Sequence, residues 1–215
     1  MGRKRPRRPR RASFAPRLIV MAKSPLAGRV KRRLAASVGV VSAARFYRTC
    51  LAHTLMRLGL DPRCRTLLAV SPDRDVRAPY WPRGIERVPQ GRGDLGMRMQ
   101  RLFRRLPPGS AIIVGSDIPA ISPSDIARAF RLLGNKDAVL GRAPDGGYWL
   151  VGSRRSPRLL APFANVRWSG PHALADTLRN LQGQRVVFAA TLGDVDSEED
   201  YHRLRGSWQR LVPPR

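Results

Sequence analysis

The sequence predicts a single three-layer α/β/α domain built on a mainly parallel β-sheet. Short apolar segments of strand length alternate along the chain with longer segments whose apolar residues recur at helical spacing. Clusters rich in glycine, proline and aspartate follow several of these strands, and ligands bind open α/β sheets at that position. The 215 residues, 42% of them hydrophobic, suffice for one domain with a sizeable core.

Each predicted element has a local reason. Six short apolar segments bounded by turn residues are expected to be strands: 17–22, 66–70, 111–115, 137–141, 148–152 and 185–189. Six segments are expected to be helices: 30–36, 42–58, 95–106, 122–133, 171–181 and a last one capped by Ser197. Ser122 followed by Pro123 is typical of a helix start, and the Pro-, Arg- and Gly-rich segment 78–94 is expected to be a loop.

The net charge of +26 is divided between a tail and the domain. Residues 1–11 hold seven basic residues and no acidic one, so the remainder keeps +19. We expect residues 1–16 to be a disordered basic tail and residues 17–215 to be the domain. The tail is a solvated extension, the product of a start codon placed too early, or an arm for nucleic acid. Residues 1–11 lack an aromatic side chain for base stacking, which disfavours the arm.

Several classes of protein are disfavoured by what the sequence lacks. No apolar run approaches the roughly 20 residues of a membrane-spanning helix, and no apolar stretch of signal-peptide length follows the basic start. We therefore expect a cytoplasmic protein without a membrane partner. Two cysteines, Cys50 and Cys64, make neither a disulfide framework nor a zinc site, and Cys50 is expected in the core. The three histidines follow no metal-binding spacing.

The first cluster of interest is MAKSPLAGRVKRRLA, residues 21–35, between the first strand and the first helix. It holds two of the four lysines in a chain that otherwise uses arginine. Backbone N–H groups and the helix dipole favour an anion at such a junction, and a lysine ammonium suits a phosphate. The candidate phosphate-binding residues are Lys23, Gly28, Arg29, Lys31 and Arg33. The Walker A pattern is absent, and a solvated basic helix start is the alternative.

Two further clusters contain carboxylates. In VGSDIPAISPSD, residues 114–125, Asp117 follows a buried strand and is a natural ligand for Mg²⁺ or Mn²⁺, the alternative being a turn residue. In APDGGYWLVGS, Asp145 begins a turn that also fits a plain hairpin. In LGDVDSEED, Asp194 and Asp196 can share a metal with a third carboxylate, or cap the last helix.

Six segments resemble, in order, the motifs of a bacterial family of GT-A-like transferases. Its members are often labelled as a domain of unknown function, or as radical-SAM-associated or arsenosugar-biosynthesis glycosyltransferases. The segments are AKSPLAGRVKRRL, GRGDLGMRM, GSDIPAISPSDI, DGGYWLVG, VRWSGPHAL and DVDSEED. The chain departs from the family at Arg32, Met97 and Gly170, where the family has Thr, Glu and Thr, which leaves the choice of nucleotide open.

The resemblance implies the fold of the nucleotide-diphospho-sugar transferases, which is similar to that of guanylyltransferases acting on molybdopterin and phospholactate. It implies that residues 23–33 hold the phosphates of a nucleotide and that the turn containing Asp94 lies near it. It implies Mg²⁺ or Mn²⁺ bound by Asp117, with Asp196 as a second ligand. The sugar or acceptor pocket would be lined by Asp145, Gly146, Gly147, Tyr148 and Trp168.

These features predict a metal-dependent transferase that takes a nucleotide-sugar or nucleotide and a small-molecule acceptor. Lys23, Lys31 and Arg33 would neutralise the leaving group, and Asp145 is a candidate base for an acceptor hydroxyl. Glycosyl transfer releases a nucleoside diphosphate, whereas nucleotidyl transfer releases pyrophosphate. We favour glycosyl transfer, because the first loop lacks the Gly-x-Gly-Thr-Arg form of sugar-nucleotide pyrophosphorylases.

A nucleic-acid-binding protein is the alternative from another class. The positive charge and four tryptophans, Trp81, Trp149, Trp168 and Trp208, are its support. The tryptophans are scattered, however, and no nucleic-acid-binding motif is present. We expect Trp149 to pack within its strand, and nucleic acid to be at most a ligand of the basic tail.

Overall fold

The computed structural model describes residues 15–155, 159–195 and 198–202. Within these ranges seven strands form one sheet in the order β3-β2-β1-β4-β6-β5-β7. Their bounds are β1 Arg17–Lys23, β2 Arg65–Ser71, β3 Glu86–Pro89, β4 Ser110–Gly115, β5 Ala138–Arg142, β6 Tyr148–Arg154 and β7 Val186–Ala189. All neighbours pair in parallel except β6, which is antiparallel to both β4 and β5. The mainly parallel sheet is therefore confirmed.

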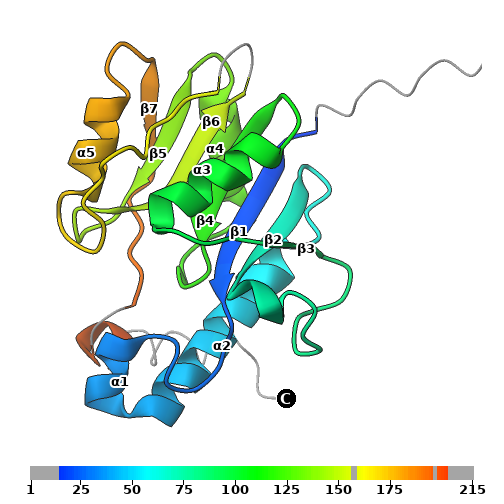
Figure 1. Cartoon of the computed structure of the whole chain (residues 1–215), viewed down its shortest axis with the longest axis vertical. Coiled ribbons are helices and arrows are strands. Elements are labelled where there is room, and N and C mark those ends of the chain that lie inside the picture. Colours follow the sequence, from blue (N-terminus) through cyan, green and yellow to red (C-terminus); the bar gives the residue numbers. More distant parts are fainter. Residues whose placement is uncertain (1–14, 156–158, 196–197, 203–215) are drawn as a thin grey trace, which may run out of the picture.

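Helices cover both faces of this sheet (Figure 1), with α3 on one face and α2 and α4 on the other. Their bounds are α1 Arg32–Val38, α2 Val40–Leu58, α3 Leu95–Arg105, α4 Pro123–Leu133 and α5 Ala173–Asn180. A short 3-10 helix spans Asp73–Asp75, and residues 198–202 are helical. None of the described helices is long and apolar enough to cross a membrane.

The three layers follow from the alternation of side chains along the central strands. In β1, the buried Leu18 and Val20 belong to the core that includes α2 and α4. Ile19, which points to the opposite face, belongs to the core that includes Met99 and Phe103 of α3. Strands that are apolar at successive positions are buried on both faces, as parallel sheets require. Two cores therefore lie on either side of one sheet.

The prediction of a loop over residues 78–94 was wrong at Glu86–Pro89, which form β3. The strand has only four residues, ERVP, and its side chains are exposed or half-buried. Its hydrogen bonds go to β2, with Leu67 opposite Glu86 and Val70 opposite Pro89. Such a short edge strand has no hydrophobic pattern of its own, so its neighbour decides its conformation.

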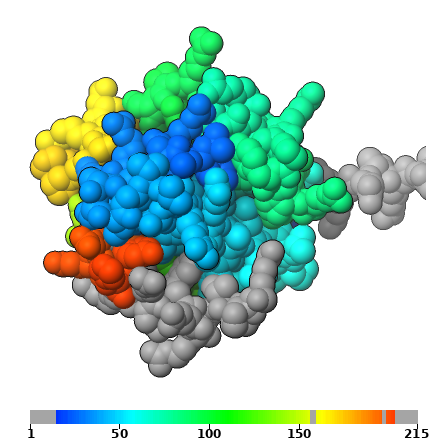
Figure 2. Space-filling model, turned by 90° about the horizontal axis from the view of Figure 1, so that it is seen from below, coloured from blue at the N-terminus to red at the C-terminus, as the bar shows by residue number. Residues whose placement is uncertain are grey.

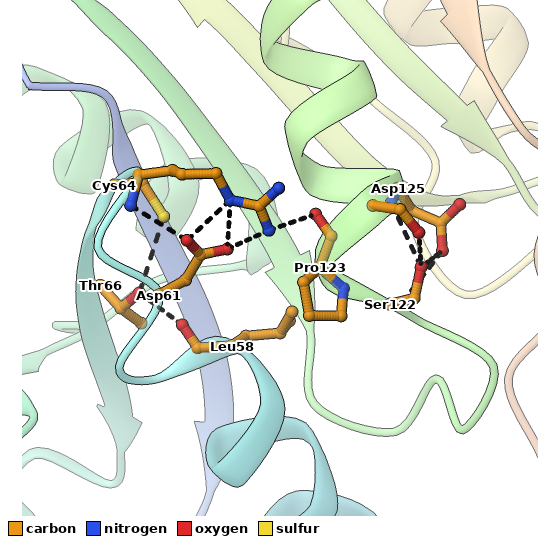
Figure 3. A network of polar contacts seen from close by, with 9 residues as sticks. Leu58, Asp61, Cys64, Thr66, Ser122, Pro123 and Asp125 are labelled. Carbon is orange, nitrogen blue, oxygen red and sulfur yellow. Dashed lines mark hydrogen bonds and ion pairs between the residues drawn. The ribbon is translucent and has the colours of Figure 1, made fainter.

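Polar contacts fix the segment between α2 and β2 against the start of α4 (Figure 3). Arg63 binds both carboxylate oxygens of Asp61 and donates from Nη2 to the carbonyl oxygen of Pro123 at 3.2 Å. Ser122 and Asp125 form a capping box at the start of α4, which confirms the predicted helix start. These contacts join the α2–β2 segment to the start of α4, at the end of segment 114–125 that lies away from Asp117 in the sequence.

Candidate functional site

Parallel pairing brings the carboxyl ends of β1, β2 and β4 to the same edge of the sheet, where Lys23 lies opposite Ser71. Tyr47 of α2 joins two of these ends. Its hydroxyl oxygen accepts from the backbone N–H of Lys23 at 2.9 Å, and it lies 2.9 Å from Oγ of Ser116. Burial raises the pKa of Tyr47 to about 12, so the hydroxyl stays protonated and also donates to the carbonyl oxygen of Lys23.

Asp117 lies two residues after the end of β4 and pairs with Lys31. The Nζ atom of Lys31 lies 2.6 Å from Oδ2 of Asp117 and 3.5 Å from Oδ2 of Asp194. The lysine side chain is only 5% exposed, whereas the carboxylates are 29% and 30% exposed. One buried ammonium therefore lies between two carboxylates that remain accessible from solvent.

Lys31 is positioned by the start of α1. Its backbone is left-handed, with φ 46° and ψ 51°, which is uncommon for a residue other than glycine. The helix therefore begins after Lys31, two residues later than predicted. A small apolar cluster holds the segment that carries Asp194 close to Lys31. In this cluster Val195 and Tyr201 pack with Leu34 and Phe46. The edge-to-face pair of Phe46 and Tyr201 has ring centroids 5.4 Å apart.

The other predicted phosphate-binding residues lie on the surface: Lys23, Gly28, Arg29 and Arg33. Gly28 has a φ of 78°, a conformation that requires glycine for an unstrained turn. Arg48 of α2 fixes the loop by donating from Nε to the carbonyl oxygen of Pro25 at 2.7 Å. This loop and the helices α1 and α2, all blue, share one face with the teal and green residues that follow β2 (Figure 2).

The turn containing Asp94 lies against the end of β2. Asp94 is the N-cap of α3, since its carboxylate accepts from the backbone N–H of Met97 at 2.7 Å. Arg98 donates to the carbonyl oxygen of Gly93 and, at 3.3 Å, to Oγ of Ser71. The conformation of Asp94 is thus explained by capping, and Arg98 is the side chain that reaches toward the strand ends.

The hairpin between β5 and β6 forms the far side of the site. The exposed Asp145 accepts from the backbone N–H of Gly147 at 2.9 Å, and Gly146 has a φ of 82°. A Cβ at Gly146 would lie 2.7 Å from Cα of Pro171, so the turn is packed closely against the start of α5. Leu192 donates to the carbonyl oxygen of Arg142, which brings the chain leading to Asp194 against this hairpin.

Tyr148 and Trp168 lie together behind the hairpin. Their rings meet edge to face with centroids 6.3 Å apart, and the Tyr148 hydroxyl accepts from Thr177 at 3.2 Å. Burial raises the pKa of Tyr148 well above its ordinary value. The indole N–H of Trp168 is buried and has no hydrogen-bond partner among the described residues. An unpaired buried donor is costly to stability, so this N–H is an unusual feature of the segment behind the hairpin.

The structure brings some of the predicted residues together and leaves others apart. Lys31 and Asp117 form an ion pair, whereas the hydrogen bond of Asp145 among the described residues is to the backbone of its own turn. The predicted metal ligand Asp196 lies outside the described residues. Sequence reasoning missed the part of Tyr47, because an aromatic residue on the apolar face of a helix looks like any core residue.

The residues present fit a divalent ion that substrate would help to hold. Mg²⁺ and Mn²⁺ prefer oxygen ligands, and Mg²⁺ in enzymes commonly uses one or two carboxylates together with waters and substrate phosphates. Asp117 and Asp194 direct oxygens toward the same point, next to the Lys31 ammonium. Among the described residues, no group of three or more His, Cys, Asp or Glu side chains could hold a metal. The protein would therefore supply two carboxylates, with the remaining ligands from elsewhere.

Residues 54–170, more than half of the chain, match a family described as "Uncharacterized protein conserved in bacteria (DUF2064)". The chain belongs to this family. The match spans Asp94, Asp117, Asp145 and Trp168, but neither Lys31 nor Asp194. The resemblance read from the sequence motifs is thereby confirmed. No curated protein sequence matches the chain.

Solved structures share the fold. A Desulfovibrio desulfuricans G20 protein assigned to the nucleotide-diphospho-sugar transferases is 25% identical, with 91% of this chain and 90% of that chain covered and a TM-score of 0.80. The 4-diphosphocytidyl-2C-methyl-D-erythritol synthase of Anaerococcus prevotii is 12% identical, covering 91% and 98%, with a TM-score of 0.60. Rv0371c of Mycobacterium tuberculosis H37Rv, solved with manganese, is 18% identical, covering 88% and 97%, with a TM-score of 0.52. These neighbours confirm the GT-A-like fold and support the transferase class.

Proposed function

We propose that this protein is a metal-dependent transferase that uses a nucleotide-diphospho-sugar donor. The observation behind the proposal is the meeting of Asp117, Lys31 and Asp194 beyond the carboxyl ends of β1 and β4. Ligands of open α/β sheets bind at this position. The naming of the Desulfovibrio neighbour as a nucleotide-diphospho-sugar transferase supports the same donor class.

In this proposal Asp117 and Asp194 hold Mg²⁺ or Mn²⁺, and Asp196 is a further candidate ligand. When bound, the ion would neutralise charge on the diphosphate. Lys31 pairs with the same two carboxylates, and its ammonium would be available to the phosphates if an ion took over that pairing. Lys23, Arg29 and Arg33 surround the same loop and stabilise the negative charge of the leaving nucleotide.

The acceptor is proposed to lie at the hairpin, bounded by Gly146, Gly147 and Tyr148. Asp145 is exposed there and can take the proton of an acceptor hydroxyl that lies within hydrogen-bond reach. Trp168, whose ring packs against Tyr148, would line the same pocket. Positioning of two substrates at neighbouring places on one sheet edge accounts for much of the expected rate gain.

The second candidate is nucleotidyl transfer. We consider it because the synthase from Anaerococcus prevotii shares the fold of this chain. The same carboxylates and cations can serve both reactions, because in both negative charge develops on a phosphate-containing leaving group. The products differ: glycosyl transfer releases a nucleoside diphosphate, and nucleotidyl transfer releases pyrophosphate from a nucleoside triphosphate.

A thermal-shift panel tests the proposal. UDP, GDP, CDP, ADP, dTDP and their common sugar conjugates are each added with and without Mn²⁺. Ligand at about a hundred times its Kd stabilises a protein by about 2.7 kcal/mol, which gives a measurable shift. We expect a Mn²⁺-dependent shift with one nucleotide, lost in Asp117→Asn and kept in Glu86→Gln, a change at the opposite end of the strands. No shift with any nucleotide would overturn the proposal.

We also propose that residues 17–215 are one transferase domain and that residues 1–16 are a tail outside it. A chain that starts at residue 17 should bind the same nucleotide with the same Mn²⁺ dependence. Loss of that binding in a folded shortened chain would place the tail within the site.

A further inference from the structure

We propose that a groove beside the candidate site binds a small amphiphile with one anionic group. The groove lies between α2 and the segment 80–85, and we call it the α2 groove. Its volume of about 720 Å³ lies within the range of small-molecule sites, roughly 300–1,000 Å³. The proposed nucleotide chemistry makes no use of it.

The walls of the α2 groove are apolar. Its floor is formed by buried side chains, which are Leu51, Leu55, Trp81 and Ile85. Its rim includes Met56 and Leu60, each 74% exposed, and Tyr80, 43% exposed. Large apolar side chains that gather at the surface of a folded chain mark binding sites more often than chance exposure. The floor and rim together suit an aliphatic or aromatic ligand body.

Two arginines give the groove its charge. Arg48 and Arg83 line it, no acidic residue does, and neither arginine forms an ion pair with a carboxylate of the described residues. Guanidinium groups of this kind bind carboxylate or phosphate. A second copy of the chain is disfavoured as the occupant, because it would bring the same positive charges together. Charge complementarity therefore favours an anionic ligand.

The α2 groove also adjoins the loop that follows β1. Pro25 and Leu26 line the groove, and the carbonyl oxygen of Pro25 accepts from Nε of Arg48. The same loop leads to Lys31. A bound amphiphile would therefore contact the loop proposed to hold the phosphates, and this coupling, unlike the binding itself, rests on the proposed function.

Calorimetric titration of the full chain with decanoate, below its micelle-forming concentration and without nucleotide or metal, tests the binding. We expect one site for decanoate and at least tenfold weaker binding of decyltrimethylammonium. Met56→Glu and Arg83→Ala should each weaken decanoate binding about tenfold, as expected when an interaction with a charged group is lost or opposed. Both residues are exposed, so the variants should fold. Val41→Glu and Arg45→Ala, exposed changes on α2 outside the groove, are the matched controls.

Four outcomes would overturn the proposal. Equal binding of both amphiphiles, or equal losses in the control variants, would show general attraction to a basic surface. Absence of decanoate binding in a folded protein would leave the groove to a macromolecular partner. A dimer in sedimentation that Met56→Glu converts to monomer would make the groove an interface between copies. Decanoate binding should survive Asp117→Asn, so this proposal and the transferase proposal can fail separately.

Discussion

Lys31 is the residue on which the geometry of the candidate site depends most. Its side chain is almost fully buried, and its ammonium pairs with two carboxylates that come from distant parts of the chain. Without a cation between them, Asp117 and Asp194 would repel each other. The lysine therefore stabilises this arrangement of the two carboxylates, and the same position suits a divalent ion.

Replacement of Lys31 with Met should lower the Tm of the protein and increase its response to Mn²⁺. The two carboxylates lose their ammonium, and the metal can then bind without competition from it. We expect an additional Mn²⁺-dependent rise in Tm of at least about 2–4 °C, the shift that 1 kcal/mol produces in a chain of this size. Lys136→Met is the control, and an equal Mn²⁺ response in both variants would contradict the expectation.

Tyr47 supports the same site through hydrogen bonds to residues beside it. Its hydroxyl contacts the backbone of Lys23 and the side chain of Ser116, the residue before Asp117. Tyr47→Phe should lower the free energy of unfolding by about 1–3 kcal/mol, because buried partners of the hydroxyl are left without a hydrogen bond. Urea titration measures this, with Tyr80→Phe as a control at an exposed tyrosine. Equal stabilities of the two variants would rule out the role assigned to Tyr47.

At the scale of elements, α5 fixes the segment that carries Trp168. Asp176 of α5 accepts from the backbone N–H of Arg167 at 3.0 Å and from its guanidinium at 2.9 Å. The Asp176 carboxylate is 3% exposed, while Arg167 is largely in solvent. One carboxylate thus joins the start of α5 to the loop that leads to Trp168.

This contact predicts a pH dependence of stability. The hydrogen bonds from Arg167 hold the pKa of Asp176 well below the ordinary carboxyl value of about 3.9. A depressed pKa contributes stability above the ordinary value, and that contribution is lost as the pH falls below it. Asp176→Asn should therefore reduce the urea midpoint clearly at pH 7 and less at pH 3. Glu199→Gln, at an exposed carboxylate, should change neither midpoint, and a loss in Asp176→Asn independent of pH would contradict the assignment.

At the scale of the whole molecule, a net charge of +26 makes some binding of polyanions unavoidable. That binding is distinct from the proposed activity, because it depends on the total field and not on Asp117.

Regular strand and helix signals also cover most of the chain outside the tail, which is why the fold class could be predicted.

RNA binding should therefore fall steeply with salt and survive Asp117→Asn, since it depends on counterion release. Nucleotide binding with Mn²⁺ should be less sensitive to salt and be lost in that variant. Filter binding and calorimetry between low and physiological salt measure the two. RNA binding that resists salt and requires Asp117 would favour the nucleic-acid-binding alternative.

The sequence alone was enough for the features that depend on local chemistry. Alternating apolar segments predicted the buried strands, Ser122 with Pro123 predicted the start of α4, and Asp145-Gly146-Gly147 predicted a tight turn. Each of these depends on neighbours within a few residues, and that is why a pattern in the sequence shows it.

The pairing of distant groups was decided by the tertiary structure. β3 forms only because β2 offers it an edge, and Asp194 reaches Lys31 only because Val195 packs beside α1 and α2. Tyr47 joins two strand ends for the same reason. A side chain's role in such cases is set by what folding brings next to it, and the order of residues in the chain carries no signal of that neighbour.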